Sequence, residues 1–81
     1  MEQSEIEGLW THIHWLSVLE EQGTYTAAAT RLGVSKSAVS QRISDLEKAS
    51  GTRLVTRTTR SVRLTEAGRA LTREVRSAYE H

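Results

Sequence analysis

The sequence contains no cysteine and no proline. Without cysteine, the chain can form neither a disulfide framework nor a thiolate metal site, and it has no thiol nucleophile. No run of about 18 apolar residues is present, so we expect no membrane-spanning helix and no membrane partner. The first ten residues, MEQSEIEGLW, are acidic and lack the apolar stretch of a secretory signal. These absences favour a cytoplasmic location.

The chain is also short, and its 81 residues suit one small continuous domain without a low-complexity linker. A domain of this size buries roughly two-thirds of its unfolded surface, so support from a partner subunit is expected. No nucleophile–base pair, glycine-rich phosphate loop or cluster of metal ligands stands out. His12 and His14 are two positions apart and point to different faces of an expected helix, which argues against a shared metal ion. We therefore expect no enzymatic activity, no cofactor and no metal.

Positive charge is scarce in one part of the chain and concentrated in another, although the formal net charge is only +1. Residues 1–22 contain five acids and no lysine or arginine, whereas residues 31–63 contain eight bases and two acids. Residues 64–81 contain three of each sign. A localised basic block favours a polyanionic partner. The simpler alternative is an unevenly charged solvated surface.

Two helices are predicted in the first part of the chain. Apolar residues recur every three or four positions over residues 6–19, which predicts an amphipathic helix that ends near Gly23. Thr24 is a suitable N-cap for a short second helix over YTAAATRL, residues 25–32. The alanines of this short helix allow a neighbouring helix to approach closely. Trp10 and Trp15 are interpreted as core residues rather than as a stacking platform.

A third helix is predicted over residues 36–50, between Gly33 and Gly51 as stop signals and with Ser35 as its N-cap. Its inner face is expected to consist of Val39, Ile43 and Leu46. Its outer face carries short hydrogen-bonding or cationic side chains at steps of three or four, namely Ser37, Ser40, Gln41, Ser44 and Lys48. Serine is a mediocre helix former, so a helix that only packs gains nothing from this outer face. We therefore favour contact with DNA for it.

The pattern changes after Gly51. RLVTRT and SVRLT carry β-branched residues near alternation, which predicts a two-stranded hairpin with its bend at residues 58–61. Thr65 is expected to cap a final helix over residues 66–81, EAGRALTREVRSAYEH. This helix has a narrow apolar seam formed by Leu71, Val75 and Ala78, joined by Gly68 and Tyr79.

Together these elements predict a mainly α fold, a winged helix-turn-helix with a three-helix core, a short β-hairpin wing and a long C-terminal linker helix. In such a fold the helix over about residues 36–50 enters the major groove, and the wing over residues 53–64 reaches the backbone or the minor groove. Serine and glutamine both donate and accept hydrogen bonds, and glutamine can pair with adenine through two of them. The candidate DNA-contacting residues are Thr26, Arg31, Ser35, Lys36, Ser37, Ser40, Gln41, Arg57, Arg60 and Arg63. Arg42 is expected either to contact DNA or to pair with a nearby acid.

Residues 23–68 resemble the N-terminal DNA-binding region of LysR-type transcriptional regulators. The matching features occur in order: paired alanines at 28–29, a serine-led helix at 35–43, DLE at 45–47 and LTEAG at 64–68. The chain departs from the usual pattern at its Lys-Ser pair, residues 36 and 37, where the family commonly has Gln-Pro, and at Val55, where phenylalanine is typical.

The resemblance implies a DNA-binding domain over residues 1–64 and a linker or dimerisation helix over residues 65–81. It implies a homodimer formed through that helix, a larger effector-binding domain that is absent from this chain, and a small-molecule effector that acts only through the absent domain. The expected dimer contacts are Leu71, Val75, Ala78 and Tyr79, because a domain this small offers no other cover for the seam. A two-fold dimer would place its recognition helices about 34 Å apart, or a multiple of that distance. The function predicted is sequence-specific binding of double-stranded DNA for transcriptional regulation, and the alternative is a winged-helix protein-interaction module with no DNA role.

Overall fold

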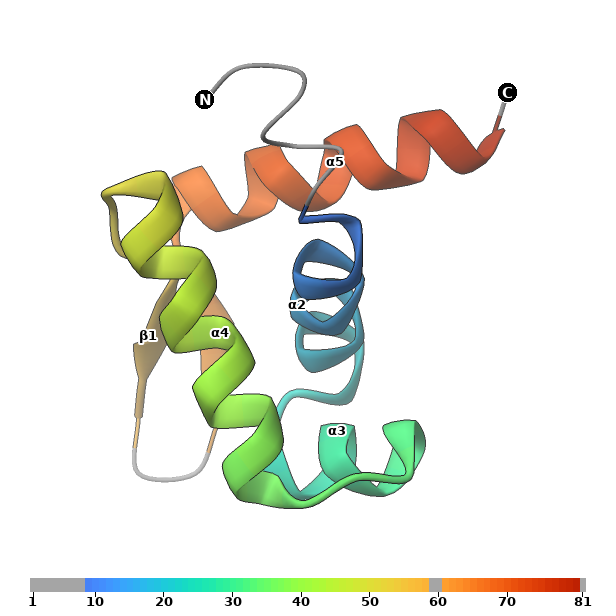
Figure 1. Ribbon diagram of the computed structural model, residues 1–81, viewed down its shortest axis with the longest axis vertical. Helices are drawn as coiled ribbons and strands as arrows, with labels where there is room; N and C mark the ends of the chain where they lie inside the picture. The colour runs from blue at the N-terminus through green and yellow to red at the C-terminus, as the bar shows by residue number, and fades with distance from the viewer. Residues whose placement is uncertain (1–8, 59–60, 81) are drawn as a thin grey trace.

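The computed structural model describes residues 9–58 and 61–80, and of residues 78–80 it describes the backbone alone. Four helices and a two-stranded antiparallel hairpin follow one another along this part of the chain (Figure 1). Their bounds are α2 (Trp10–Gln22), α3 (Tyr25–Leu32), α4 (Lys36–Ser50), β1 (Val55–Arg57), β2 (Val62–Leu64) and α5 (Glu66–Glu80). The predicted mainly α winged fold is therefore confirmed. The start of the first predicted helix, residues 6–8, lies outside the described residues.

Local capping signals explain the bounds of α3 and α4. The hydroxyl of Thr24 accepts a hydrogen bond from the backbone N–H of Ala27 at 3.1 Å, and that of Ser35 accepts one from Ala38 at 3.0 Å. Each oxygen satisfies an N–H that the first turn of a helix leaves without a partner. Gly33 ends α3 with a φ of 71°, a left-handed conformation that a residue with a Cβ rarely adopts. The predicted caps are thus confirmed.

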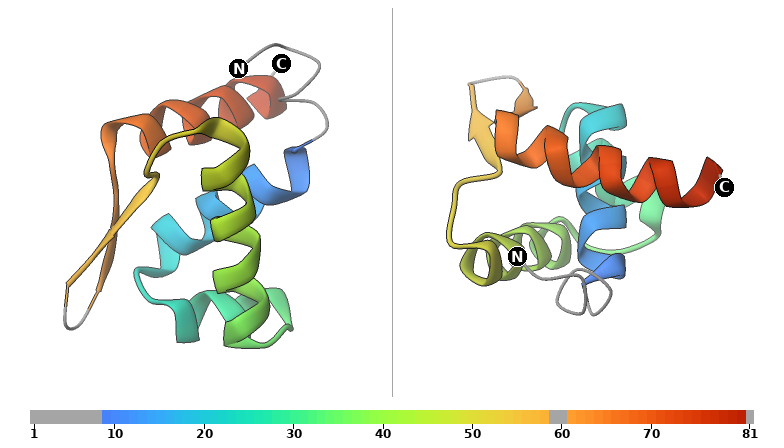
Figure 2. Two further views of the ribbon diagram at one scale, coloured as in Figure 1. Left: turned by 60° about the vertical axis from the view of Figure 1, so that its left-hand side comes forward. Right: turned by 90° about the horizontal axis from the view of Figure 1, so that it is seen from above.

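The hairpin is short and tightly registered. Val55 pairs with Leu64, Thr56 with Arg63, and Arg57 with Val62. At its bend the backbone N–H of Thr58 donates to the carbonyl oxygen of Ser61 at 2.9 Å, as predicted for a turn over residues 58–61. The hairpin is joined to the helices where the N–H of Val62 donates to the carbonyl of Gly23 at 2.8 Å. It projects from the helical body in Figure 2.

Helix α2 is the centre of the core, and it packs against α3, α4, α5 and strand β2. The buried residues come from every element, and the largest fully buried side chains are Ile13, Leu16, Leu19, Ile43, Leu46, Leu54, Val39 and Thr72. Trp10 and Trp15 are half-buried against this core, which confirms their interpretation as packing residues. Within residues 9–58 and 61–80, no helix combines the length and the apolar character needed to cross a bilayer.

Helix α5 crosses α2 and is held there by both apolar and polar contacts (Figure 2). In its first turn α5 lies beside the hairpin, and a Cβ atom at Gly68 would collide with the backbone carbonyl of Leu54. Farther along, the hydroxyl of Thr72 is 3.5 Å from a carboxylate oxygen of Glu20, and the guanidinium of Arg76 donates to the same oxygen at 2.9 Å. The direction of α5 is therefore fixed relative to α2 within one chain.

This packing corrects one expectation about the apolar seam. The expectation that a single chain offers no cover for it is wrong for Val75, which is only 3% exposed because α2 and the rest of the core cover it. Leu71 is partly buried against the same core. Ala78 and Tyr79 belong to α5, but their side chains lie outside the described part of the structure. Val75 thus contributes to the fold of one chain and has little surface left for a second.

Candidate nucleic-acid interface

The outer face of α4 carries a shallow hollow, which we call the recognition surface and which is lined by Lys36, Ser37, Ser40, Gln41 and Ser44. All of these side chains are exposed except Ser40, which is half-buried. The structure therefore brings the predicted residues of this helix together on one face, opposite its buried stripe. Every side chain of the set is short or flexible, and each can donate a hydrogen bond. Such a face lets the helix backbone come close to base edges.

A second hollow, the wing cleft, lies between the start of α3, the start of α4 and the bend of the hairpin. Lys36 lines both hollows, and Arg57 faces it from the hairpin; the lining consists of Thr24, Tyr25, Thr26, Lys36, Arg57, Thr58, Ser61 and Val62. Two cations and several hydroxyl groups around an open space are suited to an anionic oxygen such as that of a phosphate. The cleft and the recognition surface thus form one continuous cationic and hydroxyl-rich region.

The strand register places the wing arginines on different faces of the hairpin. Arg57 alternates with Thr56 and shares its face with buried Val55 and Val62, so it points toward the helices. Its guanidinium lies 4.6 Å from the ring centre of Tyr25, a cation–π contact that orients the arginine. Arg63 pairs with Thr56 on the opposite, exposed face.

Arg60 lies outside the described residues, so its predicted contact stays a prediction. The sequence alone gave no signal for the contact of Arg57 with Tyr25, because the two residues meet only when the hairpin folds back onto α3.

A carboxylate that the residue pattern did not single out fixes the hairpin to the recognition helix. One oxygen of Glu47 accepts hydrogen bonds from the backbone N–H of Leu54 at 2.8 Å and from that of Val55 at 3.4 Å. Glu47 lines, with Ser44 and Arg57, a groove between α4 and the hairpin. Glu47 thus helps to hold the wing at a fixed distance from the recognition surface. Its only sequence signal was its place in the DLE motif of the family resemblance.

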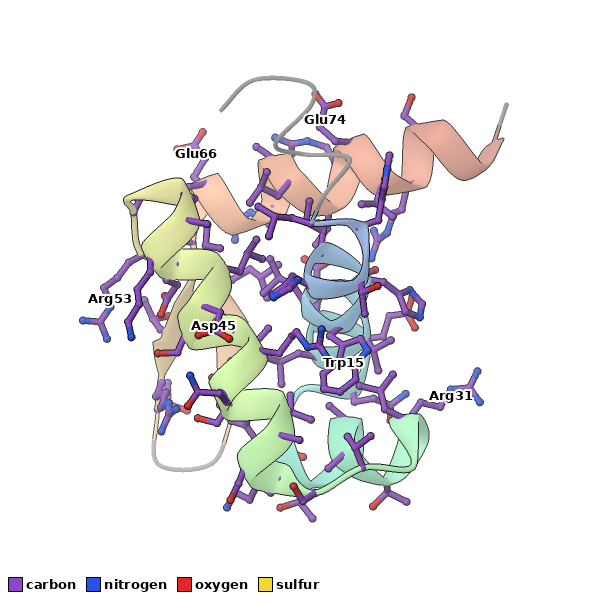
Figure 3. All side chains as sticks on the ribbon, in the orientation of Figure 1. Trp15, Arg31, Asp45, Arg53, Glu66 and Glu74 are labelled. Atoms are coloured by element: carbon purple, nitrogen blue, oxygen red, sulfur yellow. The ribbon has the colours of Figure 1, made fainter. Side chains whose placement is uncertain are left out.

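Three predicted residues are placed less centrally. Ser35 is exposed, but its hydroxyl is engaged as the cap of α4. Arg31 is in the last turn of α3, and its side chain points away from α4 and the hairpin in Figure 3. The guanidinium of Arg42 lies 4.5 Å from the ring centre of Trp15, and its contact with DNA or with a nearby acid stays a prediction. Contact of Arg31 or Ser35 with DNA remains a prediction.

His12 of α2 lies near the rim of α4. Burial, and to a lesser extent the positive charge of Arg42, lower the pKa of His12 from its ordinary value of 6.5, while the charge of Asp45 opposes this shift. Its Nδ1 atom is buried and has no hydrogen-bond partner among the described residues. In the part of the chain that the structure describes, no group of three or more potential metal ligands comes together.

Comparison with known proteins places this geometry in a family context. Residues 10–69 match the model of the family described as "Bacterial regulatory helix-turn-helix protein, lysR family". The transcriptional regulator PgrR of Escherichia coli is 44% identical over 71 residues, which cover 88% of this chain and 22% of that protein. A putative transcriptional regulator of Pseudomonas aeruginosa is 49% identical over 59 residues, which cover 73% of this chain and 19% of that protein. The chain thus spans about a fifth of the length of these curated relatives.

Solved structures show the same arrangement of elements. A complex of the DNA-binding domain of CbnR with DNA superimposes with a TM-score of 0.81 and 31% identity, over 88% of this chain and 82% of that one. Full-length CbnR, a LysR family transcriptional regulator, gives a TM-score of 0.80 over 25% of its length. The similarity to this DNA-bound domain therefore extends over most of both chains.

Proposed function

The chain belongs to the lysR family of bacterial regulatory helix-turn-helix proteins, and we propose that it binds double-stranded DNA in a sequence-specific manner for the regulation of transcription. The observation that carries the proposal is the continuity of the recognition surface with the wing cleft through Lys36. One surface can read base edges while the other holds the adjoining backbone. The DNA-bound CbnR domain is of comparable length, which supports binding by a chain of this size.

In the proposed complex, α4 lies in the major groove with its first two turns against the bases. Ser37 and Ser40 are short enough to let the helix approach, and Gln41 can pair with the N6 and N7 atoms of adenine. Lys36 can reach a guanine edge or a phosphate. Because the inner side of α4 is locked into the core by Ile43 and Leu46, these groups approach the groove on a rigid support.

The backbone contacts are assigned to the wing cleft. A phosphate oxygen in the cleft would lie between Lys36 and Arg57, with the hydroxyl of Thr26 at its edge. The stacking of Arg57 on Tyr25 reduces the conformational freedom that the arginine loses on binding. Arg63 on the outer face of the hairpin would meet a different phosphate or the minor groove, and Arg31 and Ser35 are kept as further backbone candidates. These contacts position the duplex, while α4 supplies the selectivity.

Two chains are proposed to bind one pseudo-palindromic site through pairing of their α5 helices. Leu71 is only partly buried in one chain, and it remains a candidate contact with Ala78 and Tyr79. We assign residues 1–64 to the DNA-binding unit and residues 65–81 to the linker. The relatives are about five times longer, which supports control by an effector-binding domain not included in this chain. We propose that this regulator has no enzymatic activity and acts in the cytoplasm, where the bacterial chromosome is located.

A salt series tests the proposal. Binding of a selected duplex and of a random duplex is measured by fluorescence anisotropy at increasing salt concentration. Each neutralised phosphate should contribute about −0.9 to the slope of log K against log salt. Arg57→Ala should make the slope less steep by about one unit if its guanidinium meets a phosphate. Arg73→Ala, which removes the same charge from an exposed position on α5, is the matched control and should leave the slope unchanged.

Failure to bind either duplex at low salt, or binding that does not depend on salt, would contradict a DNA-binding role. In that case the protein-interaction module would be the better explanation. Sedimentation of the chain with a palindromic duplex measures the stoichiometry, and two chains per duplex are expected.

A further inference from the structure

Gln41 is held in one orientation by its own helix. Its side-chain Nε2 donates a hydrogen bond to Oδ1 of Asp45 at 2.9 Å, across one turn of α4. A carboxylate can only accept hydrogen bonds, so the nitrogen end of the amide, and not its oxygen, must face Asp45. The bond thus decides both where the amide lies and which way round it is turned.

The two acids of α4 have different partners. The carboxylate of Glu47 is used by backbone N–H groups at the start of the hairpin. That of Asp45 is exposed, lies beside the recognition surface and is bonded to Gln41 (Figure 3). A negative charge next to DNA opposes binding, because it repels the phosphates. The position of Asp45 is therefore explained better by a role in base selectivity than by a contribution to the affinity for DNA.

The bond leaves Gln41 with one free N–H and with its carbonyl oxygen. These two groups match the N7 acceptor and the N6 amino donor that adenine presents in the major groove. The second oxygen of Asp45, meanwhile, disfavours a neighbouring base edge that presents acceptors, such as O6 and N7 of guanine or O4 of thymine. Orientation and repulsion thus act in the same direction.

We propose that Asp45 is a positioning residue that determines the base selectivity of Gln41, favouring adenine and rejecting acceptor-rich edges. This inference rests on the proposed DNA-binding function. It adds that selectivity at one base pair is shared between a residue that contacts the base and one that orients it. Removal of Asp45 should therefore broaden the sequence preference without weakening attachment to DNA.

The experiment is selection of bound sequences from a random duplex pool, followed by affinity measurements on duplexes that differ at one base pair. Gln41→Ala first identifies the base pair that Gln41 reads, as the position at which preference is lost. Asp45→Ala should weaken the base preference at the same position. The expected loss of discrimination is roughly fivefold or more, where fivefold corresponds to the weakest discrimination that a good bidentate contact provides. Its affinity for random duplex should stay equal or rise, because a negative charge is removed. A merely structural defect would lower both quantities.

Three further variants complete the design. Asp45→Asn keeps an oxygen that can accept from Gln41 and should retain much of the discrimination. The double variant Asp45→Ala with Gln41→Ala should discriminate no less than Gln41→Ala alone, because the two residues act as a unit. Glu74→Ala removes an exposed acid from α5 and should leave base preference unchanged.

The outcomes separate this inference from the proposed function. If the wild-type chain binds no duplex, both are overturned. If it binds with a sequence preference that Gln41→Ala leaves intact, or if Asp45→Ala leaves the Gln41 position unchanged, only the inference is overturned. The inference would also be overturned if Asp45→Ala lowered the discrimination by the same factor in the wild-type chain and in Gln41→Ala. The inference is supported if Asp45→Ala relaxes the Gln41 position, if Asp45→Asn keeps much of the discrimination there, and if Asp45→Ala causes no further loss when Gln41 is already alanine.

Discussion

The two faces of α4 follow different rules. On the inner face, Val39, Ile43 and Leu46 are at most 2% exposed and are packed against other elements. On the outer face, Ser37 and Gln41 are exposed and contribute almost nothing to the core. One face holds the helix in place, and the other is free to vary in sequence without loss of the fold. Stability and selectivity can therefore be changed independently in a helix of only 15 residues.

Residues at the borders between the faces connect the two functions. Glu47 joins α4 to the hairpin, and Asp45 orients a side chain of the outer face. A substitution at Glu47 should affect both stability and DNA binding, whereas one in the centre of a face should affect a single property. Substitutions at Leu46 and Glu47 test this division, and one at His12 of α2 tests how pH changes the stability of the packing beside α4.

The largest effect is expected for Leu46→Ala on the inner face. Truncating a fully buried leucine should lower the free energy of unfolding by about 2–5 kcal/mol, through lost burial and the cavity that remains. Denaturant unfolding measures this loss, and Ile43→Val, expected to cost about 0.5–1.5 kcal/mol, gives a value if Leu46→Ala does not fold. Ser44→Ala on the outer face is the control, with a change within about 0.5 kcal/mol. A similar loss for Ser44→Ala would contradict the division.

An intermediate effect on both properties is expected for Glu47→Ala. The substitution leaves the N–H groups of Leu54 and Val55 without their acceptor, which should cost about 1–3 kcal/mol. Hydrogen exchange of these two amides should accelerate, and binding of duplex should weaken because the hairpin is no longer held at a fixed distance from α4. Glu47→Gln keeps an accepting oxygen and should restore much of the amide protection and much of the affinity for duplex. Exchange rates that stay unchanged in Glu47→Ala would show that the carboxylate does not hold the hairpin.

The smallest effect is expected from His12, at the rim between α2 and α4. Burial and the charge of Arg42 lower its pKa below 6.5, so the unfolded chain takes up a proton more readily than the folded one. Stability should therefore fall as the pH drops below 6.5, and His12→Gln should remove part of this fall. Unfolding free energies at pH 7.5 and 5.5 measure it, with His14→Gln, an exposed residue on the same helix, as the control. An identical pH dependence in wild type and His12→Gln would contradict the assignment.

Much of this fold is encoded by signals that act over a few residues. Thr24 and Ser35 cap α3 and α4 by accepting a hydrogen bond from the N–H three positions ahead, and Gly33 and Gly51 adopt the left-handed conformation that ends these helices. The outer face of α4 follows from helical periodicity, because its residues recur every three or four positions. The bond from Gln41 to Asp45 is also local, one turn apart, and its spacing is visible in the sequence.

Other features depend on elements that meet only after folding. The cover of Val75 by the core, the contact of Arg57 with Tyr25 and the bond from Glu47 to the hairpin join residues far apart along the chain or across a turn. The sequence placed Val75 correctly on an apolar stripe of α5 but could not show which partner would cover it. An amphipathic pattern records that a face is buried, and it does not record whether the neighbour belongs to the same chain.

The absence of a single methyl group at Gly68 has a mechanical consequence. At Gly68, α5 contacts the backbone carbonyl of Leu54, and farther along Arg76 forms an ion pair with Glu20 of α2. A change in the tilt of α5 about its N-terminal end would therefore have to alter the contact with Leu54 and the contact with Glu20 at the same time. The angle between α5 and the recognition surface thus depends on how closely the backbone at Gly68 can approach that of Leu54.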